Sequence, residues 1–307
     1  MTFLLAIDQG TTSTRCVIYD EDLNIVKSEQ KEYPLLYPED GWVEVDPNQL
    51  LESVYDTLDP LLDSTFTIKC VGITNQRETT LVWDSVSGVP IYNGIVWQDR
   101  RTADYCSSLK AQNLEPIINK KTGLLLDPYF SATKISWILD NVEGAREKAL
   151  KGDLRFGTVD TFLLWHLSGG QLHKTDVTNA SRTNIFNIHS MEWDQELLNI
   201  FDIPASMLPE VCSSDAEFGL LSRKGSTIPI TSMIGDQQSA LVGQECFNYG
   251  DMKATFGTGC FLMVNSGQKP QSSKSGLLST VGYGLQGSIS YALEGSIFSA
   301  GTTIQWL

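Results

Sequence analysis

The sequence predicts an α/β fold built from two similar halves. Strand-like and helix-like stretches alternate along all 307 residues. The first half opens on an apolar strand, 3–7, which runs through the polar turn 8–13 into a second apolar strand. A reduced copy of this strand–turn–strand pattern recurs at 252–264, and both turns combine glycine with threonine. We therefore expect a duplicated fold that holds phosphate between its halves.

Composition and charge narrow the class of protein. The chain is 41% hydrophobic and 19% charged, which is typical of a globular protein with two domains at this length. The net charge of −15 and the lack of a basic run exclude a nucleic-acid or membrane-binding surface. No stretch resembles a signal peptide or a bilayer span, and the six cysteines form no C-x-x-C pair. We expect a cytoplasmic protein without membrane insertion.

The elements follow in order from these patterns. Three strands, 3–7, 14–20 and 24–33, form a meander. A helix then begins at Pro47, with Asp46 as its N-cap. The later predictions are a strand at 68–75, a strand at 94–97, a helix near 99–111, a turn before a helix at 132–141, a mainly helical region over 113–215, and a strand at 228–234 that leads to a helix at 239–243.

A domain boundary is predicted near 247–250, which gives domains 1–247 and 248–307. The second domain is expected to contain strands near 252–256, 260–265, 277–283 and 289–294, with a helix starting at 299. The chain then stops without a C-cap or a polar tail. We expect a partial chain that is inactive alone, with the opening strands of a second domain and little else.

The turn 8–13 is the first candidate site. Hydroxyls and turn N–H groups can hold phosphate oxygens, and the Asp8 carboxylate can hold Mg²⁺. The alternative is a common polar hairpin turn. The matching turn at 257–259 favours the phosphate site, whereas the G-x-x-x-x-G-K-S/T and protein-kinase signatures are absent. A nucleotide-dependent phosphotransferase is the favoured interpretation.

Polar or aromatic residues follow two strands and one turn. Arg77 and Glu78, after strand 68–75, suit vicinal hydroxyls that both donate and accept; the alternative is a surface ion pair. Trp97 would cover the carbon skeleton of a polyol, or would belong to the core. Tyr129 would direct its hydroxyl into a cleft, or would pack within its turn.

Asp236 is the sharpest single candidate. An apolar strand delivers it to a glycine turn just before a helix, where a general base for a hydroxyl nucleophile should lie. The alternative is an N-cap aspartate. The closing segments 292–296 and 300–305 are weaker, because a glycine that opens a helix only permits close backbone approach to a phosphate.

Taken together, the motifs resemble one family over essentially the whole chain. The runs 7–13, 72–80, 127–131, 157–161, 178–183 and 235–238 are similar to those of the glycerol kinases, which are FGGY carbohydrate kinases. The resemblance implies the ribonuclease H-like (actin-like ATPase) fold. It implies a complete first domain that binds glycerol and holds the catalytic base, followed by the opening strands of a similar, nucleotide-binding domain.

The resemblance also implies an activity and a set of roles. Glycerol would be phosphorylated by ATP with Mg²⁺ to give sn-glycerol 3-phosphate and ADP, in a homo-oligomeric full-length protein. Asp236 would be the general base, and Asp8 would place Mg²⁺ directly or through a water. The glycerol-binding residues would be Arg77, Glu78, Trp97, Tyr129, Asp236 and Gln237. The phosphate- and nucleotide-binding residues would be Thr11, Thr12, Ser13, Arg15, Thr258, Gly301 and Gln305.

One departure and two alternatives accompany this interpretation. Bacterial members that fructose 1,6-bisphosphate inhibits carry Gly-Gly-Thr-Arg where this chain has Lys224-Gly225-Ser226-Thr227, so we do not expect that inhibition. A different FGGY kinase, acting on a pentitol or pentulose, is the nearer alternative. A short paralogue that binds a polyol without catalysis is the more distant one.

Overall fold

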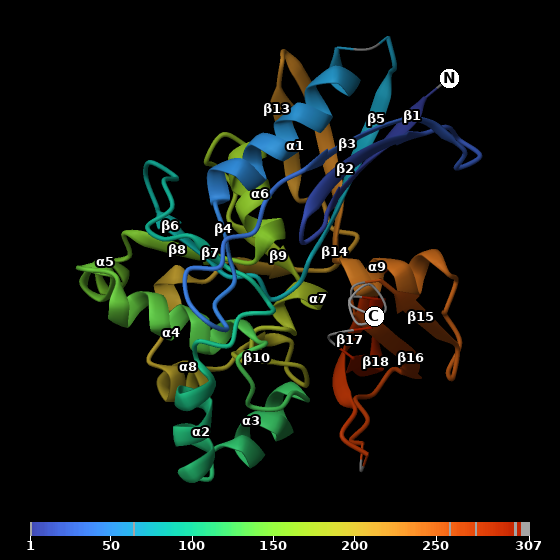
Figure 1. Ribbon diagram of the computed structural model, residues 1–307. Coiled ribbons are helices and arrows are strands. Elements are labelled where there is room, and N and C mark those ends of the chain that lie inside the picture. The colour runs from blue at the N-terminus through green and yellow to red at the C-terminus, as the bar shows by residue number, and fades with distance from the viewer. Residues whose placement is uncertain (1, 64, 258, 274, 298–299, 302–307) are drawn as a thin grey trace.

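The computed structural model describes residues 2–63, 65–257, 259–273, 275–297 and 300–301. Its larger sheet has the strand order β13-β14-β5-β1-β2-β3 (Figure 1). The strands are β1 (Phe3–Gln9), β2 (Ser13–Tyr19), β3 (Ile25–Glu32), β5 (Ile68–Asn75), β13 (Gly219–Arg223) and β14 (Ser226–Gly235). The predicted meander β1-β2-β3 is confirmed, and β1, β5 and β14 run parallel. Their carboxyl ends therefore meet at one edge of the sheet.

Helix α1 (Pro47–Leu62) packs on this sheet because its apolar residues recur at helical spacing. The predicted N-cap is confirmed, since the Asp46 side chain accepts a hydrogen bond from the Asn48 amide. Helix α6 (Val159–Leu167) contributes to the same apolar core as α1 and the sheet. Burial of this core between helices and sheet holds the strand ends in place.

The middle of the chain contains the predicted helices and also short strands, of which only the one at 94–95, inside the predicted strand 94–97, was expected. The helices are α2 (Ala103–Ala111), α3 (Glu115–Thr122), α4 (Ser131–Asn141), α5 (Ala145–Lys151), α7 (Val177–Ala180), α8 (Gln195–Phe201) and the 3₁₀ helix Ala205–Met207. The short strands pair as β4 (Glu44–Val45) with β7 (Gly94–Ile95), β6 (Leu81–Asp84) with β8 (Leu154–Gly157), β9 (Lys174–Asp176) with β12 (Glu210–Cys212), and β10 (Phe186–Asn187) with β11 (Glu192–Trp193). Strands this short leave no alternating pattern to detect.

A second, antiparallel sheet has the order β15-β16-β18-β17. Its strands, β15 (Met252–Phe256), β16 (Cys260–Gly267), β17 (Leu278–Leu285) and β18 (Ser288–Ile297), confirm the four predicted strands. The β15–β16 hairpin repeats the β1–β2 arrangement, but β18 takes the third position in place of the next strand along the chain. The predicted domain boundary falls in the connection 244–251, and the predicted final helix lies almost entirely outside the described residues.

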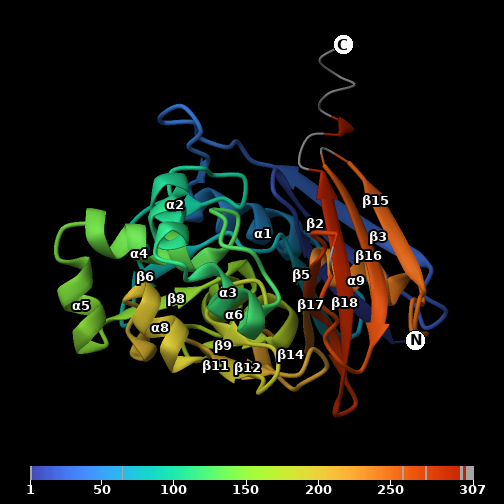
Figure 2. The ribbon, with the colours of Figure 1, turned by 90° about the horizontal axis from the view of Figure 1, so that it is seen from below.

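The second sheet lies beside the rest of the chain (Figure 2), and it contacts α7 and the end of α3 through apolar side chains and a close backbone approach. Val177 and Ala180 of α7 share an apolar cluster with Val281 and Tyr291 of the second sheet. The Ser279 amide donates to the Gly123 carbonyl at 3.0 Å. A Cβ at Gly123, whose φ is +74°, would lie 2.3 Å from the Ser279 oxygen, so only glycine permits this contact.

In the part of the chain that the structure describes, no helix combines the length and the apolar character that crossing a membrane requires.

Candidate active site

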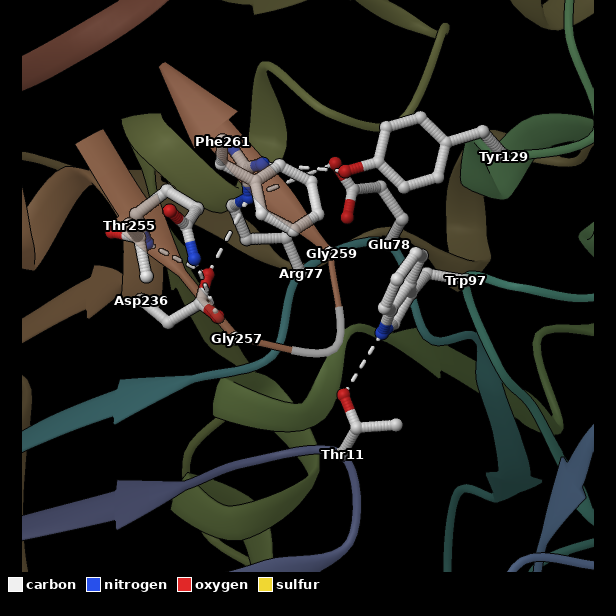
Figure 3. Close-up of a pocket in the computed structure, with 11 residues that line it drawn as sticks. Thr11, Arg77, Glu78, Trp97, Tyr129, Asp236, Thr255, Gly257, Gly259 and Phe261 are labelled. Atoms are coloured by element: carbon white, nitrogen blue, oxygen red, sulfur yellow. Dashed lines mark hydrogen bonds and ion pairs between the residues drawn. The ribbon is translucent and has the colours of Figure 1, made fainter. Parts of the chain in front are cut away.

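The site forms where β1, β5 and β14 end together. Gln9 pairs with Asn75, and Asn75 pairs with Gly235, so the polar segments that follow these three residues meet at one edge. The turn between β15 and β16 faces this edge and closes a cavity of about 170 Å³ (Figure 3). Seven predicted residues line it: Thr11, Arg77, Glu78, Trp97, Tyr129, Asp236 and Gln237. Gly257 and Gly259, from the predicted phosphate-binding turn 257–259, also line it, together with Thr255 and Phe261, which were not predicted.

Arg77 and Glu78 are buried, with 2% and 1% of their surface exposed, so the surface ion-pair alternative is wrong. The Arg77 guanidinium donates to both carboxylate oxygens of Glu294, at 2.6 and 3.2 Å, and to the Tyr129 hydroxyl at 3.2 Å. Burial acts to lower the pKa of Arg77, but the negative groups around it, with Glu294 foremost and Glu78 and Asp236 among them, together outweigh burial and raise this pKa. Arg77 is therefore a fixed cation at the cavity wall.

Glu294 and Arg182 complete a buried network that sequence analysis missed. Arg182 donates from Nε to Glu78 at 2.6 Å and from Nη2 to Glu294 at 2.7 Å. Two guanidinium and two carboxylate groups thus alternate. Burial raises the pKa of Glu78. Burial also acts to raise the pKa of Glu294, but Arg182 and Arg77 overcome it and lower that pKa to about 2. Both missed residues lie in quoted runs, yet no local pattern assigns them to this site.

Asp236 is the first residue of α9 (Asp236–Gly243), which begins earlier than the predicted 239. It is not the N-cap, since Gly235 holds that position. One carboxylate oxygen accepts from the Gln237 amide at 2.7 Å and lies 3.5 Å from Arg77 Nε, while 34% of the side chain stays exposed. Desolvation by the surrounding walls raises the pKa of Asp236, and the Arg77 charge opposes this rise.

Hydrogen bonding to α7 fixes the turn that carries Asp236. The Gly235 amide donates to the Thr178 hydroxyl at 2.9 Å, and that hydroxyl donates to the buried Asp176 carboxylate at 2.8 Å. A Cβ at Gly235 would lie 2.9 Å from Arg77 Cγ and Cδ. This close packing places the Asp236 carboxylate beside the Arg77 guanidinium.

Three aromatic rings bound the other side of the cavity. Trp97 lies edge-on to Tyr129, with ring centroids 5.8 Å apart, and to Phe261 at 5.9 Å. Trp97 is half-buried: it packs against the apolar core and also lines the cavity, so neither alternative for it excludes the other. Tyr129 is buried, as in the packed-turn alternative, but its hydroxyl reaches Arg77. The Trp97 indole N–H donates to the Thr11 hydroxyl at 2.9 Å, which joins this wall to the β1–β2 turn (Figure 3).

The second sheet contributes a buried cation. Lys253 of β15 is 5% exposed and donates to Gln237 and, at 2.9 Å, to the Thr255 hydroxyl. Burial lowers the pKa of Lys253 to about 8. Gln237 is thereby fixed between its own helix and the second sheet.

The β1–β2 turn lies beside the cavity, and only Thr11 of its predicted residues lines it. The Gly10 carbonyl accepts from Gln9 at 2.8 Å, from Gln76 at 3.1 Å and from Tyr33, so the turn is firmly held. The predicted residues that do not line the cavity are Asp8, Thr12 and Arg15, which are exposed, and Ser13, which is half-buried.

Two predicted nucleotide-binding residues, Thr258 and Gln305, lie outside the described residues. The third, Gly301, donates from its amide to the Gly257 carbonyl at 3.0 Å, which places it near the β15–β16 turn. Among the residues that the structure describes, no group of three or more His, Cys, Asp or Glu side chains could hold a metal ion.

Comparison with known proteins identifies the family. Residues 3–243 match the N-terminal domain of the FGGY family of carbohydrate kinases. The chain belongs to this family. The glycerol kinase of Ectopseudomonas mendocina is 56% identical over 99% of the chain and 63% of that protein. The glycerol kinase of Alteromonas mediterranea is 58% identical, with the same shares covered. The chain thus spans about 63% of the length of these curated relatives.

Solved structures confirm the predicted ribonuclease H-like (actin-like ATPase) fold. The crystal structure of Plasmodium falciparum glycerol kinase with ADP matches with a TM-score of 0.95 and 41% identity, over 100% of this chain and 63% of that chain. A ligand-bound xylulose kinase from Lactobacillus acidophilus matches with a TM-score of 0.88 at 22% identity, over 100% of this chain and 62% of its own. The second likeness concerns the fold alone.

Proposed function

We propose that the protein containing these 307 residues phosphorylates glycerol with ATP and produces sn-glycerol 3-phosphate and ADP. The observation that carries this proposal is the Asp236 carboxylate, partly exposed to a small cavity whose other walls are Arg77, Glu78 and aromatic rings. A cavity of about 170 Å³ suits a three-carbon polyol better than a pentulose. Relatives above 50% identity that are named glycerol kinase favour the same substrate.

In the proposed reaction, the Asp236 carboxylate accepts the proton of one terminal hydroxyl of glycerol. The resulting oxygen forms a bond to the γ-phosphorus, and the bond from that phosphorus to the β–γ bridging oxygen breaks, so ADP leaves. Arg77 donates to the remaining hydroxyls and Glu78 accepts from them. The rings of Trp97 and Phe261 lie against the carbon skeleton and exclude water.

The turn at 10–13 and Arg15 would meet the transferred phosphoryl group, and Thr258, Gly301 and Gln305 would meet ADP. Asp8 fits a Mg²⁺ ion that is bound mainly by phosphate and water, because it offers one exposed carboxylate beside this turn. Bound there, the ion would neutralise charge on the phosphates. A cytoplasmic location and self-association stay predictions.

A substrate panel tests the proposal. Purified protein is given saturating Mg-ATP with glycerol, ribulose, xylulose or a pentitol, and ADP release is measured. We expect kcat/KM for glycerol to exceed that for each five-carbon compound by ~10-fold or more, since the larger compounds fit the small cavity less well. Faster turnover of a pentulose would instead support the other FGGY kinases. Polyol binding without any phosphate transfer would support a non-catalytic paralogue.

A further inference from the structure

One buried lysine lies beneath three of the segments that form the cavity. Lys134 on α4 has no exposed surface, and its ammonium donates to the backbone carbonyls of Tyr129 at 2.9 Å, Glu78 at 3.1 Å and Val96 at 3.5 Å. Glu78 and Tyr129 line the cavity themselves, and Val96 directly precedes Trp97, which also lines it. Lys134 does not line the cavity. Its three hydrogen bonds therefore connect the backbones of three segments that carry cavity-lining residues, from the side away from the cavity.

The contact to Glu78 matters most, because the backbone there is unusual. Glu78 has a backbone φ of +60°, which residues other than glycine rarely adopt. Its carbonyl accepts hydrogen bonds from both Lys134 and the Ser131 hydroxyl, the latter at 3.1 Å. Two donors from one helix thus hold the backbone that directs the Glu78 carboxylate toward the cavity and toward Arg182.

A buried ammonium is costly unless its surroundings compensate for lost water. Around Lys134, the carboxylates of Glu78, Asp99 and Asp127 favour the charged form, whereas Arg101 opposes it. Burial is the larger effect and lowers the pKa of Lys134 to about 7. A methionine would fill the same space without this cost, but it could not donate to the three carbonyls.

We propose that Lys134 is a positioning residue that sets the shape of the polyol pocket by holding the segments of Glu78, Trp97 and Tyr129 together. This inference rests on the proposed function. Because Lys134 acts on the polyol side of the cavity, its loss should weaken polyol binding and leave nucleotide binding unchanged. A residue that supported only the stability of the fold would not separate the two substrates.

The test is Lys134→Met in the protein that contains these residues, with KM measured separately for glycerol and ATP. We expect KM for glycerol to rise by ~10-fold or more, as for loss of charge-assisted hydrogen bonds, with KM for ATP unchanged. Lys134→Gln keeps a donor group and should show a smaller rise. The control is Ser136→Ala, on the same helix, because the buried Ser136 hydroxyl donates to the Phe201 carbonyl at 2.7 Å, outside the cavity lining.

The outcomes separate this inference from the proposed function. Failure of the wild-type protein to phosphorylate glycerol overturns the function. If the wild type is active and a folded Lys134→Met variant has an unchanged KM for glycerol, the inference is overturned. An equal rise of KM for ATP and KM for glycerol also overturns it. If Lys134→Met does not fold, Ser131→Ala, which removes the other α4 donor to the Glu78 carbonyl and leaves the Thr80 hydroxyl in place, must raise KM for glycerol. If KM for glycerol then rises in neither Ser131→Ala nor Lys134→Gln, the inference is overturned.

Discussion

Asp236 combines two properties that a general base for an alcohol needs. Desolvation raises the pKa of its carboxyl group, which makes the carboxylate a stronger base than an aspartate in water. The Arg77 guanidinium, whose Nε lies 3.5 Å away, opposes this rise and favours the ionised form. The second carboxylate oxygen accepts a hydrogen bond from the Gln237 side-chain amide at 3.3 Å, and 34% of the Asp236 side chain is exposed, which leaves room for a substrate hydroxyl.

We expect Asp236→Asn to lower kcat by at least ~10²-fold, because the amide cannot accept the hydroxyl proton. Glycerol binding, followed by calorimetry, should change much less, since the amide is isosteric. Near-normal turnover in this variant would remove Asp236 from the proposed role.

The pH profile of the same pair of proteins provides a second readout. The base form of Asp236 is lost as pH falls through its folded pKa, and that pKa lies above the ordinary value of 3.8. Wild-type kcat/KM for glycerol, which reports the pKa of the free enzyme, should therefore decline on acidification with a midpoint above pH 3.8, and the residual activity of Asp236→Asn should lack this decline. An identical acid decline in both proteins would assign it to another group.

At the scale of elements, the junction of β14 and α9 determines how close the base comes to Arg77. The parallel pairing of β14 with β5 brings Gly235 opposite Asn75, and Arg77 follows two residues later. Gly235 is required here for space and not for a left-handed φ, because its φ is −60°. The missing side chain is what lets Arg77 pass beneath the turn.

Gly235→Ala should lower kcat/KM for glycerol by ~10-fold or more and destabilise the fold by ~1–3 kcal/mol, because the new methyl would displace Arg77. Gly243→Ala, at the end of the same helix, is a matched control, since nothing lies within 4 Å of its added Cβ. Kinetics and urea unfolding of both variants check the prediction. Equal effects at the two positions would contradict it.

At the scale of the whole molecule, Glu294 is the main polar link between the two sheets at the site. It extends from β18 of the second sheet into the pair of arginines that the first part of the chain contributes. Its pKa, lowered to about 2, means that its stabilising charge is present above pH 4.5 and is lost as pH falls toward 2. The contact that holds the second sheet in place at the site is thus the same contact that orients the Arg77 guanidinium.

Glu294→Gln should destabilise the protein by ~3–5 kcal/mol, because the two buried guanidinium groups lose the carboxylate that they share, and Glu78 and the partly exposed Asp236 remain as their partners. It should also raise KM for glycerol, since Arg77 loses its bidentate acceptor. Asp202→Asn is the control. It removes an ion pair with Arg146 at the surface, where 82% of the Asp202 side chain is exposed. Thermal unfolding and KM for glycerol, measured on both variants, test this prediction. A Glu294→Gln variant as stable as Asp202→Asn would contradict the proposed link.

Sequence patterns were sufficient for features that depend on neighbours along the chain. The α/β class, the meander, the cap of α1, the helix at 132–141 and the strands of the second sheet all follow from local periodicity and turn chemistry. Seven residues predicted for the site do line one cavity, because each follows a strand or begins a turn and motif spacing records that placement. Their individual roles remain proposals.

The sequence by itself thus determined the class, the family resemblance and seven of the residues that line the cavity. Only the tertiary structure decided that β18 and not β17 lies beside β16, that Arg182 and Glu294 complete the ion network, and that Lys134 holds three walls from behind. The physical reason is distance along the chain. A buried charge is tolerated only beside its partner, and the partner of Arg77 is Glu294, brought close by the docking of two sheets, which no local pattern of residues records.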